Sequence, residues 1–334
     1  MKSRQQHHIF GPVPSRRLGR SLGVDLVPFK TCTFDCIYCQ LGRTTCHTIE
    51  RKEWTPMETV LDELKRKLAC RPDYITLSGS GEPTLHSRLG EIIEHIQAMT
   101  AVPVAVLTNG SLLWQPQVRA ELALADVVLP SLDAGDAIKF NFINRPHASL
   151  SFDQVVEGLI AFRREFTGQY WLEVFLLAGY TAILDDVNRI AALVKKIRPD
   201  RVQLNTVARP PVEEFALSVV PEELARLARR FSPRAEVVAE QPSRLAHKSR
   251  KLDARAALDL LRRRPCTAED VARGLGVNRL ETLKRLEVLV AQGEIETSRH
   301  EYEIFYRASV IPSGHPPEAS SRCPKKRINK PKTS

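Results

Sequence analysis

Three of the seven cysteines in this chain lie close together, in the segment Thr31–Cys39, with the spacing C-x3-C-x2-C. Thiolates are soft ligands that bind iron–sulfur clusters and zinc. In a reducing compartment, clustered cysteines indicate metal binding or catalysis more often than disulfides. Three thiolates would leave one iron of a four-iron cluster open to a substrate or cofactor. Zinc remains an alternative, because Cys46 or His47 could complete a closed four-ligand site.

A second polar motif, Ser80-Gly81-Glu82, follows the predicted strand Tyr74–Leu77. Glycine adopts backbone conformations that other residues avoid, and it lets the backbone approach a ligand closely. The Glu82 carboxylate could accept hydrogen bonds from a ligand ammonium group. A glycine turn that only precedes a helix is the simpler interpretation of the same residues.

Polar residues also follow three later predicted strands. Asn109 ends the third, Ser131 and Asp133 end the fourth, and Arg209 follows the sixth. The carboxyl ends of parallel strands are where α/β proteins bind ligands. Arg209 could bind an anionic substrate group or be a loop residue before Pro210–Pro211. Asn109 could equally be a turn residue.

The elements that must position these residues alternate between apolar strands and amphipathic helices, which predicts parallel strands with right-handed crossovers. We predict an α/β fold, a partial (βα)6 parallel barrel with a small C-terminal winged-helix domain. The predicted strands are Leu22–Val27, Tyr74–Leu77, Pro103–Leu107, Val127–Ser131, Trp171–Leu177 and Arg201–Asn205. The predicted helices are Pro56–Cys70, Leu89–Met99, Gln115–Ala123, Phe152–Phe166 and Asp186–Ile197.

C-x3-C-x-aromatic-C after the first strand of such a chain resembles the signature of the radical S-adenosylmethionine (radical SAM) superfamily. The resemblance implies that Cys32, Cys36 and Cys39 bind a 4Fe–4S cluster whose open iron chelates S-adenosylmethionine. Reductive cleavage would then release a 5′-deoxyadenosyl radical, with electrons from a reductase or donor such as flavodoxin or ferredoxin.

The same resemblance implies five residues that contact S-adenosylmethionine. Tyr38 would lie near the adenine, although it could be a plain packing residue. Gly81 and Glu82 would contact the amino group. Ser131 and Asp133 would contact the ribose. In the superfamily this loop contains Gly-Gly-Glu, whereas Ser80 replaces the first glycine here.

Several segments together resemble the wyosine-synthase-like branch of the superfamily, whose members modify tRNA. These are Phe10–Gly19, the cysteine loop, the segment around Glu82, Ser131–Asp133 and Asn144–Pro146, and the resemblance covers about residues 9–215. Wyosine synthases bind a second cluster through further N-terminal cysteines, and this chain has no cysteine before Cys32. The resemblance therefore implies the radical chemistry more strongly than the wyosine reaction itself.

A different pattern begins after the Pro-, Ser- and charge-rich segment Ser232–Lys251. Helix, helix, turn, helix and two strand-like runs follow, which is the order of a winged helix-turn-helix. We predict domains at 1–245 and 250–310, then a basic disordered tail at 311–334. Candidate nucleic-acid contacts are Arg279, Lys284 and Arg285. Residues 250–321 carry 12 basic and 11 acidic side chains, so tRNA or DNA binding depends on the tail as well.

Composition narrows the class of protein. The 334 residues are 43% hydrophobic and 26% charged, as in soluble globular proteins, and no apolar run is long enough to span a bilayer. The N-terminus lacks a signal-peptide pattern, which predicts a cytoplasmic location without membrane association. The sequence thus favours a radical SAM enzyme on an unidentified substrate, with tRNA or another nucleic acid as a candidate. The alternative is an iron–sulfur redox-sensing DNA-binding regulator.

Overall fold

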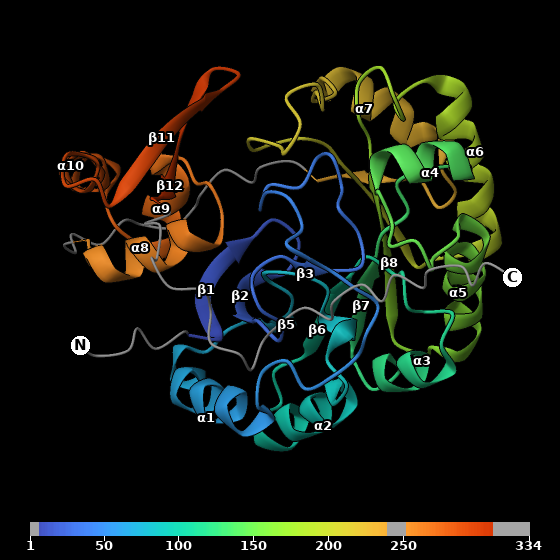
Figure 1. Ribbon diagram of the computed structural model, residues 1–334, viewed down its shortest axis with the longest axis horizontal. Helices are drawn as coiled ribbons and strands as arrows, with labels where there is room; N and C mark the ends of the chain where they lie inside the picture. The colour runs from blue at the N-terminus through green and yellow to red at the C-terminus, as the bar shows by residue number, and fades with distance from the viewer. Residues whose placement is uncertain (1–6, 239–251, 310–334) are drawn as a thin grey trace, which may run out of the picture.

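A curved, mainly parallel sheet forms the body of the protein (Figure 1). The computed structural model describes residues 7–238 and 252–309. The strand order is β1-β2-β5-β6-β7-β8-β9-β10, and only the β1–β2 pair is antiparallel. The strands span Ile9–Ser15, Gly19–Val24, Tyr74–Leu77, Val104–Thr108, Val127–Pro130, Gln169–Phe175, Arg201–Asn205 and Glu236–Val237.

Helices cover the outer side of this sheet, as Figure 1 shows for α1, α2, α3, α5 and α6. Apolar side chains at helical spacing face the strands; in α2, for example, Ile92, Ile93 and Ile96 are completely buried. The helices are α1 Met57–Lys67, α2 Leu89–Met99, α3 Pro116–Leu122, α4 Ala137–Ile143, α5 Phe152–Glu165, α6 Leu184–Ile197 and α7 Pro221–Leu227.

The predicted α/β partial barrel is confirmed. All six predicted strands are present and lie side by side in parallel. The sheet is also wider than predicted, because β1 adds an antiparallel edge and β10 a short parallel one. Two short helices, α4 and α7, were not predicted.

The last described residues, Leu252–Ser309, form the C-terminal module. It contains α8 Ala254–Arg263, α9 Ala268–Leu275, α10 Arg279–Ala291 and the hairpin of β11 Ile295–His300 and β12 Glu303–Ala308. These are the predicted three helices and hairpin. The module has its own apolar core, against which Val13 of β1 also packs.

The limits of the predicted domains stay a prediction. The limits at 245 and 250 and the basic tail at 311–334 lie outside the described residues. Among the helices of the described ranges, none is long and apolar enough to cross a membrane.

Candidate active site

The cysteine loop follows β2 at the carboxyl-end edge of the sheet and lies against the end of α4. The amide of Ile37 donates to the Ile143 carbonyl at 2.9 Å, and the amide of Asp35 donates to the Asn144 carbonyl at 3.0 Å. Two short strands, β3 (Thr31–Cys32) and β4 (Cys46–His47), pair in parallel beside the loop. The loop is therefore held on both sides by backbone hydrogen bonds.

Each of the three sulfurs in this loop accepts a hydrogen bond from a nitrogen. Lys30 Nζ lies 3.1 Å from Cys39 Sγ, and Lys30 is only 3% exposed. Asn109 Nδ2 lies 3.6 Å from Cys32 Sγ, and Asn144 Nδ2 lies 3.6 Å from Cys36 Sγ. Hydrogen bonds to sulfur stabilise negative charge on cluster ligands and tune cluster potentials.

In their ionised form, these sulfurs need a cationic group beside them, which an apolar core would not supply. Burial raises the pKa of Cys32 to about 12 and that of Cys36 well above its ordinary value, so as free thiols they would stay protonated. Within the described ranges, no group of three His, Cys, Asp or Glu side chains is arranged to hold a single metal ion. A cubane spreads its three thiolates over three irons, and three half-buried thiols with nitrogen donors fit that group.

Glu82 lies beside Cys32 and is 2% exposed. Its Oε1 accepts hydrogen bonds from the Thr108 hydroxyl at 2.6 Å and from the hydroxyl and amide of Thr84. Its Oε2 accepts a hydrogen bond from the backbone amide of Asn109 at 2.8 Å. Burial raises the pKa of Glu82, and these hydrogen bonds oppose the rise. A carboxylate offers about four acceptor positions, so Oε2 retains one for a ligand.

Gly81 is where the backbone before Glu82 meets the cysteine loop. A Cβ there would lie 1.9 Å from the Thr31 carbonyl oxygen, closer than any real contact. Next to it, the amide of Glu82 donates to that same carbonyl at 3.1 Å. Glycine is thus required for the two loops to pack together, and Ser80, at the position of the first glycine in the family motif, binds Asp25 instead.

Tyr38 and Asp133, both predicted from the sequence, are in direct contact. The Tyr38 hydroxyl donates to Asp133 Oδ2, which also accepts from Asn144 Nδ2 at 2.9 Å. Asp133 Oδ1 accepts from the Phe175 amide at 3.1 Å. Burial raises the pKa of Asp133 to about 6 and keeps Tyr38 protonated by raising its pKa well above 10. The Tyr38 ring stacks on Phe175 at 3.9 Å between centroids.

Ser131 lies at the end of β7 and pairs with Glu173 through an isolated parallel bridge. It is half-buried, near Asp133 in sequence. Hydrogen bonds thus connect most of the predicted residues in two groups. In the first, Asn109 links Glu82 to Cys32. In the second, Asn144 links Asp133 to Cys36.

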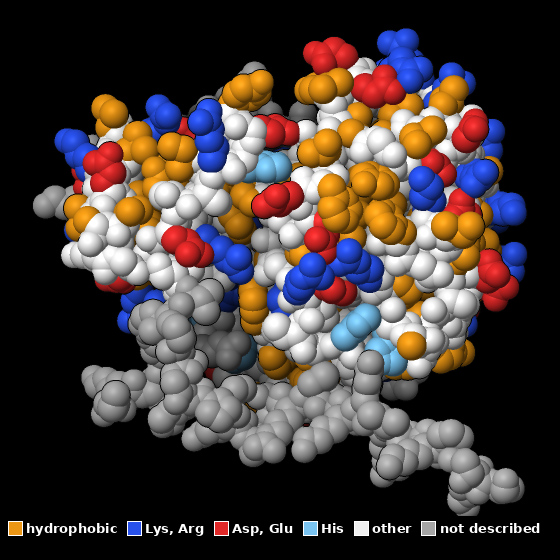
Figure 2. All heavy atoms as spheres, turned by 45° about the horizontal axis from the view of Figure 1, so that its top comes forward, with side chains coloured by type: hydrophobic (Ala, Val, Ile, Leu, Met, Phe, Trp, Pro, Cys, Tyr) orange, Lys and Arg blue, Asp and Glu red, His pale blue; other side chains and the backbone are white. Residues whose placement is uncertain are grey.

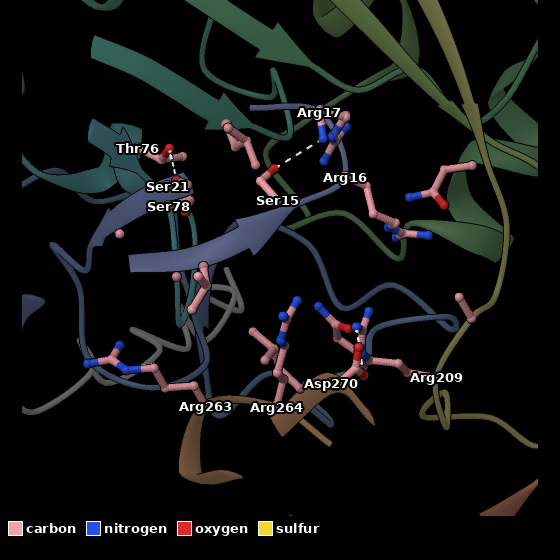
Figure 3. A pocket seen from close by; sticks show the side chains of 18 of the residues that line it. Ser15, Arg16, Arg17, Ser21, Thr76, Ser78, Arg209, Arg263, Arg264 and Asp270 are labelled. Atoms are coloured by element: carbon pink, nitrogen blue, oxygen red, sulfur yellow. Dashed lines mark hydrogen bonds and ion pairs between the residues drawn. The ribbon is translucent and has the colours of Figure 1, made fainter. Parts of the chain in front are cut away.

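A cavity of about 400 Å³ extends from Tyr38 and Cys39 through the concave side of the sheet to the C-terminal module (Figure 3). Of the residues singled out in the sequence, Tyr38, Cys39, Ser80 and Arg209 line it. Residues not predicted from the sequence form much of the rest: Arg16 and Arg17 after β1, and Arg263 and Arg264 at the end of α8. The two Arg-Arg pairs are visible in the sequence, but nothing there indicates that they meet.

The fold and the site together define a class of protein. Its members have a partial α/β barrel and a three-cysteine loop at the carboxyl ends of the strands. The sequence model of the radical SAM superfamily matches residues 26–194. The chain belongs to this superfamily, whose members are enzymes that use a 4Fe–4S cluster and S-adenosylmethionine.

Two curated relatives and one solved structure illustrate the similarity. A UPF0026 protein of Helicobacter pylori is 34% identical over 306 residues, which cover 90% of this chain and 97% of that protein. A protein of Brachyspira hyodysenteriae described as GTPase Obg is 38% identical over 292 residues, 86% of this chain and 43% of that protein. A radical SAM methyltransferase from Sphaerobacter thermophilus shares the fold, with a TM-score of 0.51 and 16% identity over 65% of this chain and 66% of that one.

The chain covers less than two thirds of some relatives. It spans 43% of the Brachyspira protein and 65% of a UPF0026 protein from Methanocaldococcus jannaschii, to which it is 38% identical.

Proposed function

We propose that this chain is a radical SAM enzyme that reductively cleaves S-adenosylmethionine and directs the resulting 5′-deoxyadenosyl radical to a substrate in the cavity. The observation that carries the proposal is the set of three half-buried thiols, each with a nitrogen donor on its sulfur, of which Cys39 lines the cavity. Cys32, Cys36 and Cys39 would hold the cluster, which when bound supplies one electron for cleavage of the sulfonium.

The side chains around the thiols would bind and orient S-adenosylmethionine. Glu82 Oε2 has capacity for a hydrogen bond from the ligand ammonium, and Gly81 brings Glu82 close to Cys32. Tyr38 lines the cavity, and its neutral ring would lie beside the adenine. Ser131 would contact the ribose.

Asp133 has a different proposed role from the one expected from the sequence. Both its oxygens already accept hydrogen bonds, and it is 4% exposed. We therefore assign it mainly to positioning, because it fixes the Tyr38 hydroxyl and the Asn144 amide that reaches Cys36. A direct contact of Asp133 with the ribose remains a prediction.

The decisive experiment is anaerobic. Cluster-loaded protein, mixed with dithionite and S-adenosylmethionine, should form 5′-deoxyadenosine in excess over cluster, detected by chromatography. Protein that carries about four irons and four sulfides per chain but forms none would contradict the proposed function.

Glu82→Ala should weaken S-adenosylmethionine binding by about tenfold or more, because it removes a charged acceptor for the ammonium. Equilibrium dialysis of cluster-loaded protein measures the affinity. Glu63→Ala is the matched control, since Glu63 is also buried and binds backbone amides, those of His8 and Ile9, away from the thiols. Equal affinities for Glu82→Ala and wild type would leave Glu82 as only a cap of the turn Pro83–Leu85.

The finer predictions from the sequence remain proposals. These are a place in the wyosine-synthase-like branch, tRNA or another nucleic acid as substrate, and a flavodoxin or ferredoxin as electron donor. On the face shown in Figure 2, basic and acidic side chains are interspersed, whereas nucleic-acid binding favours a continuous basic surface. The regulator alternative gains no support from the relatives.

A further inference from the structure

The cavity beside the thiols has a strongly basic lining. Six arginines and two carboxylates contribute to it, and the arginines come from both parts of the protein. Arg16, Arg17 and Arg209 belong to the barrel, and Arg263, Arg264 and Arg273 to the C-terminal module. The carboxylates are Glu173 and Asp270. Arg209 is buried and the other five are half-buried, and positive charge removed from water in this excess is costly unless a negative group is bound nearby.

Three of the arginines are held by carboxylates across the cavity wall. Arg17 pairs with Glu173, Arg263 with Asp25 at 3.1 Å, and Arg209 with Asp270 at 3.2 Å. The last two pairs join the barrel to the C-terminal module. They fix the positions of the guanidinium groups before any ligand binds, so less side-chain entropy is lost on binding.

Two further guanidinium donors in the lining lack an acceptor. Arg209 is 9% exposed, and its Nε makes no hydrogen bond to any described residue. The buried Nε of Arg273 also makes no hydrogen bond to any described residue. Buried N–H groups are nearly always paired in native proteins, because leaving one unpaired costs free energy. An acceptor that occupies the cavity would satisfy them.

Arg264 completes this wall. It follows α8, and Figure 3 shows its side chain extending into the cavity beside the Arg209–Asp270 pair. Among the residues that the structure describes, no carboxylate or other acceptor binds its guanidinium. A fixed, charged fork of donors is the geometry that proteins use for phosphate and carboxylate groups.

We propose that this cavity binds the oxyanionic group, a phosphate or carboxylate, of a small-molecule substrate, with Arg264 and Arg209 as its ligands. The inference rests on the proposed function, because the same cavity reaches Tyr38 and Cys39 and so would hold the substrate next to the radical. Its volume of about 400 Å³ is that of a small-molecule site. The C-terminal module thus supplies part of the substrate site.

The test is calorimetric titration of the cluster-loaded full chain with two probes, pyrophosphate and succinate, at constant ionic strength. Wild type should bind at least one of the two probes. The probe with the higher affinity shows whether the site prefers a phosphate or a carboxylate group. Arg264→Gln should weaken binding by about tenfold or more, and Arg264→Lys, which keeps the charge, by less. Arg299→Gln is the matched control, because Arg299 is exposed on β11 of the same module, and its affinity should equal that of wild type.

Three results would overturn the proposal: no binding of either probe by wild type, equal affinities of Arg264→Gln and wild type, or the same loss in Arg299→Gln. Binding of tRNA that is lost in Arg285→Gln but kept in Arg264→Gln would place substrate recognition on α10 and overturn it as well. Formation of 5′-deoxyadenosine is measured separately in each variant. Wild type that binds pyrophosphate but forms no 5′-deoxyadenosine would refute the proposed function and leave the anion site standing.

Discussion

Replacing Cys32, Cys36 or Cys39 singly by alanine should abolish both cluster incorporation and formation of 5′-deoxyadenosine. Each sulfur lies in one short loop and has its own nitrogen donor, from Asn109, Asn144 and Lys30 respectively. With one thiolate missing, a second iron would lack a protein ligand. Iron and sulfide analysis after anaerobic reconstitution, with the visible absorbance of the cluster, measures the loss.

Cys70→Ala provides the control for these three variants. Cys70 is half-buried in a 3₁₀ turn after α1, where its carbonyl accepts a hydrogen bond from Arg20, and this turn is not part of the thiol loop. Its variant should take up about four irons and four sulfides, as wild type should. Stoichiometric zinc without sulfide in the wild type would refute the cluster assignment and restore the zinc alternative. Retention of the full cluster in any one of the three loop variants would remove that cysteine from the ligand set.

The regular elements of the barrel could be predicted because local patterns determine them. Leu89–Met99 shows apolar residues at helical spacing, and α2 has these same bounds. Tyr74–Leu77 is a short apolar run, and it forms β5, whose last three residues are buried because parallel strands are covered on both faces. Such signals lie within a dozen residues and need no knowledge of the rest of the chain.

The elements that were missed lack such local signals. β1 contains Pro12 and Pro14, and proline argues against a strand. The prolines are tolerated because β1 is an edge strand whose register is irregular between Phe10 and Val13. α4 has only seven residues, too few for a periodic pattern, and is stabilised at its start by the Asp136 side chain. Tertiary packing, which the sequence does not display, decides both.

The residues of the site differ in the same way: those in continuous motifs could be predicted, and those brought together by tertiary packing could not. The cysteine loop and Ser80-Gly81-Glu82 are continuous motifs and could be recognised directly. Two of the three donors to sulfur come from residues far along the chain: Asn109 is 77 positions from Cys32, and Asn144 is 108 positions from Cys36. The arginine wall depends on the C-terminal module packing on β1, and no pattern within either part predicts that contact.

The contact between Arg263 of the module and Asp25 of the barrel, 238 positions apart in the chain, should contribute strongly to stability. Asp25 is 5% exposed, and Arg263 also donates to the His7 carbonyl and lies over the Phe10 ring at 4.1 Å. Arg263→Ala leaves the buried Asp25 carboxylate without its cation. Breaking a buried pair in this way costs about 3–5 kcal/mol of unfolding free energy. Urea denaturation measures the loss.

The loss in Arg263→Ala should depend on pH in a defined direction. Burial raises the pKa of Asp25 above its ordinary 3.8, and Arg263 opposes that rise. A raised carboxyl pKa means that the folded state holds the proton more tightly, so the free energy of unfolding falls as pH rises above that ordinary value. Removing Arg263 raises the pKa of Asp25 further and extends this fall to higher pH. The difference between variant and wild type should therefore be larger at about pH 8 than at about pH 5.

Asp25→Asn in the Arg263→Ala background separates the unpaired charge from the lost packing. An asparagine can still accept from the Ser80 amide and donate to the Ser80 hydroxyl, where Asp25 now binds both groups. It carries no charge, so the double variant should recover much of the lost stability at about pH 8 and show little change with pH. A double variant no more stable than Arg263→Ala, with the same pH dependence, would mean that the stacking on Phe10 and the bond to His7, and not the buried carboxylate, make Arg263 important.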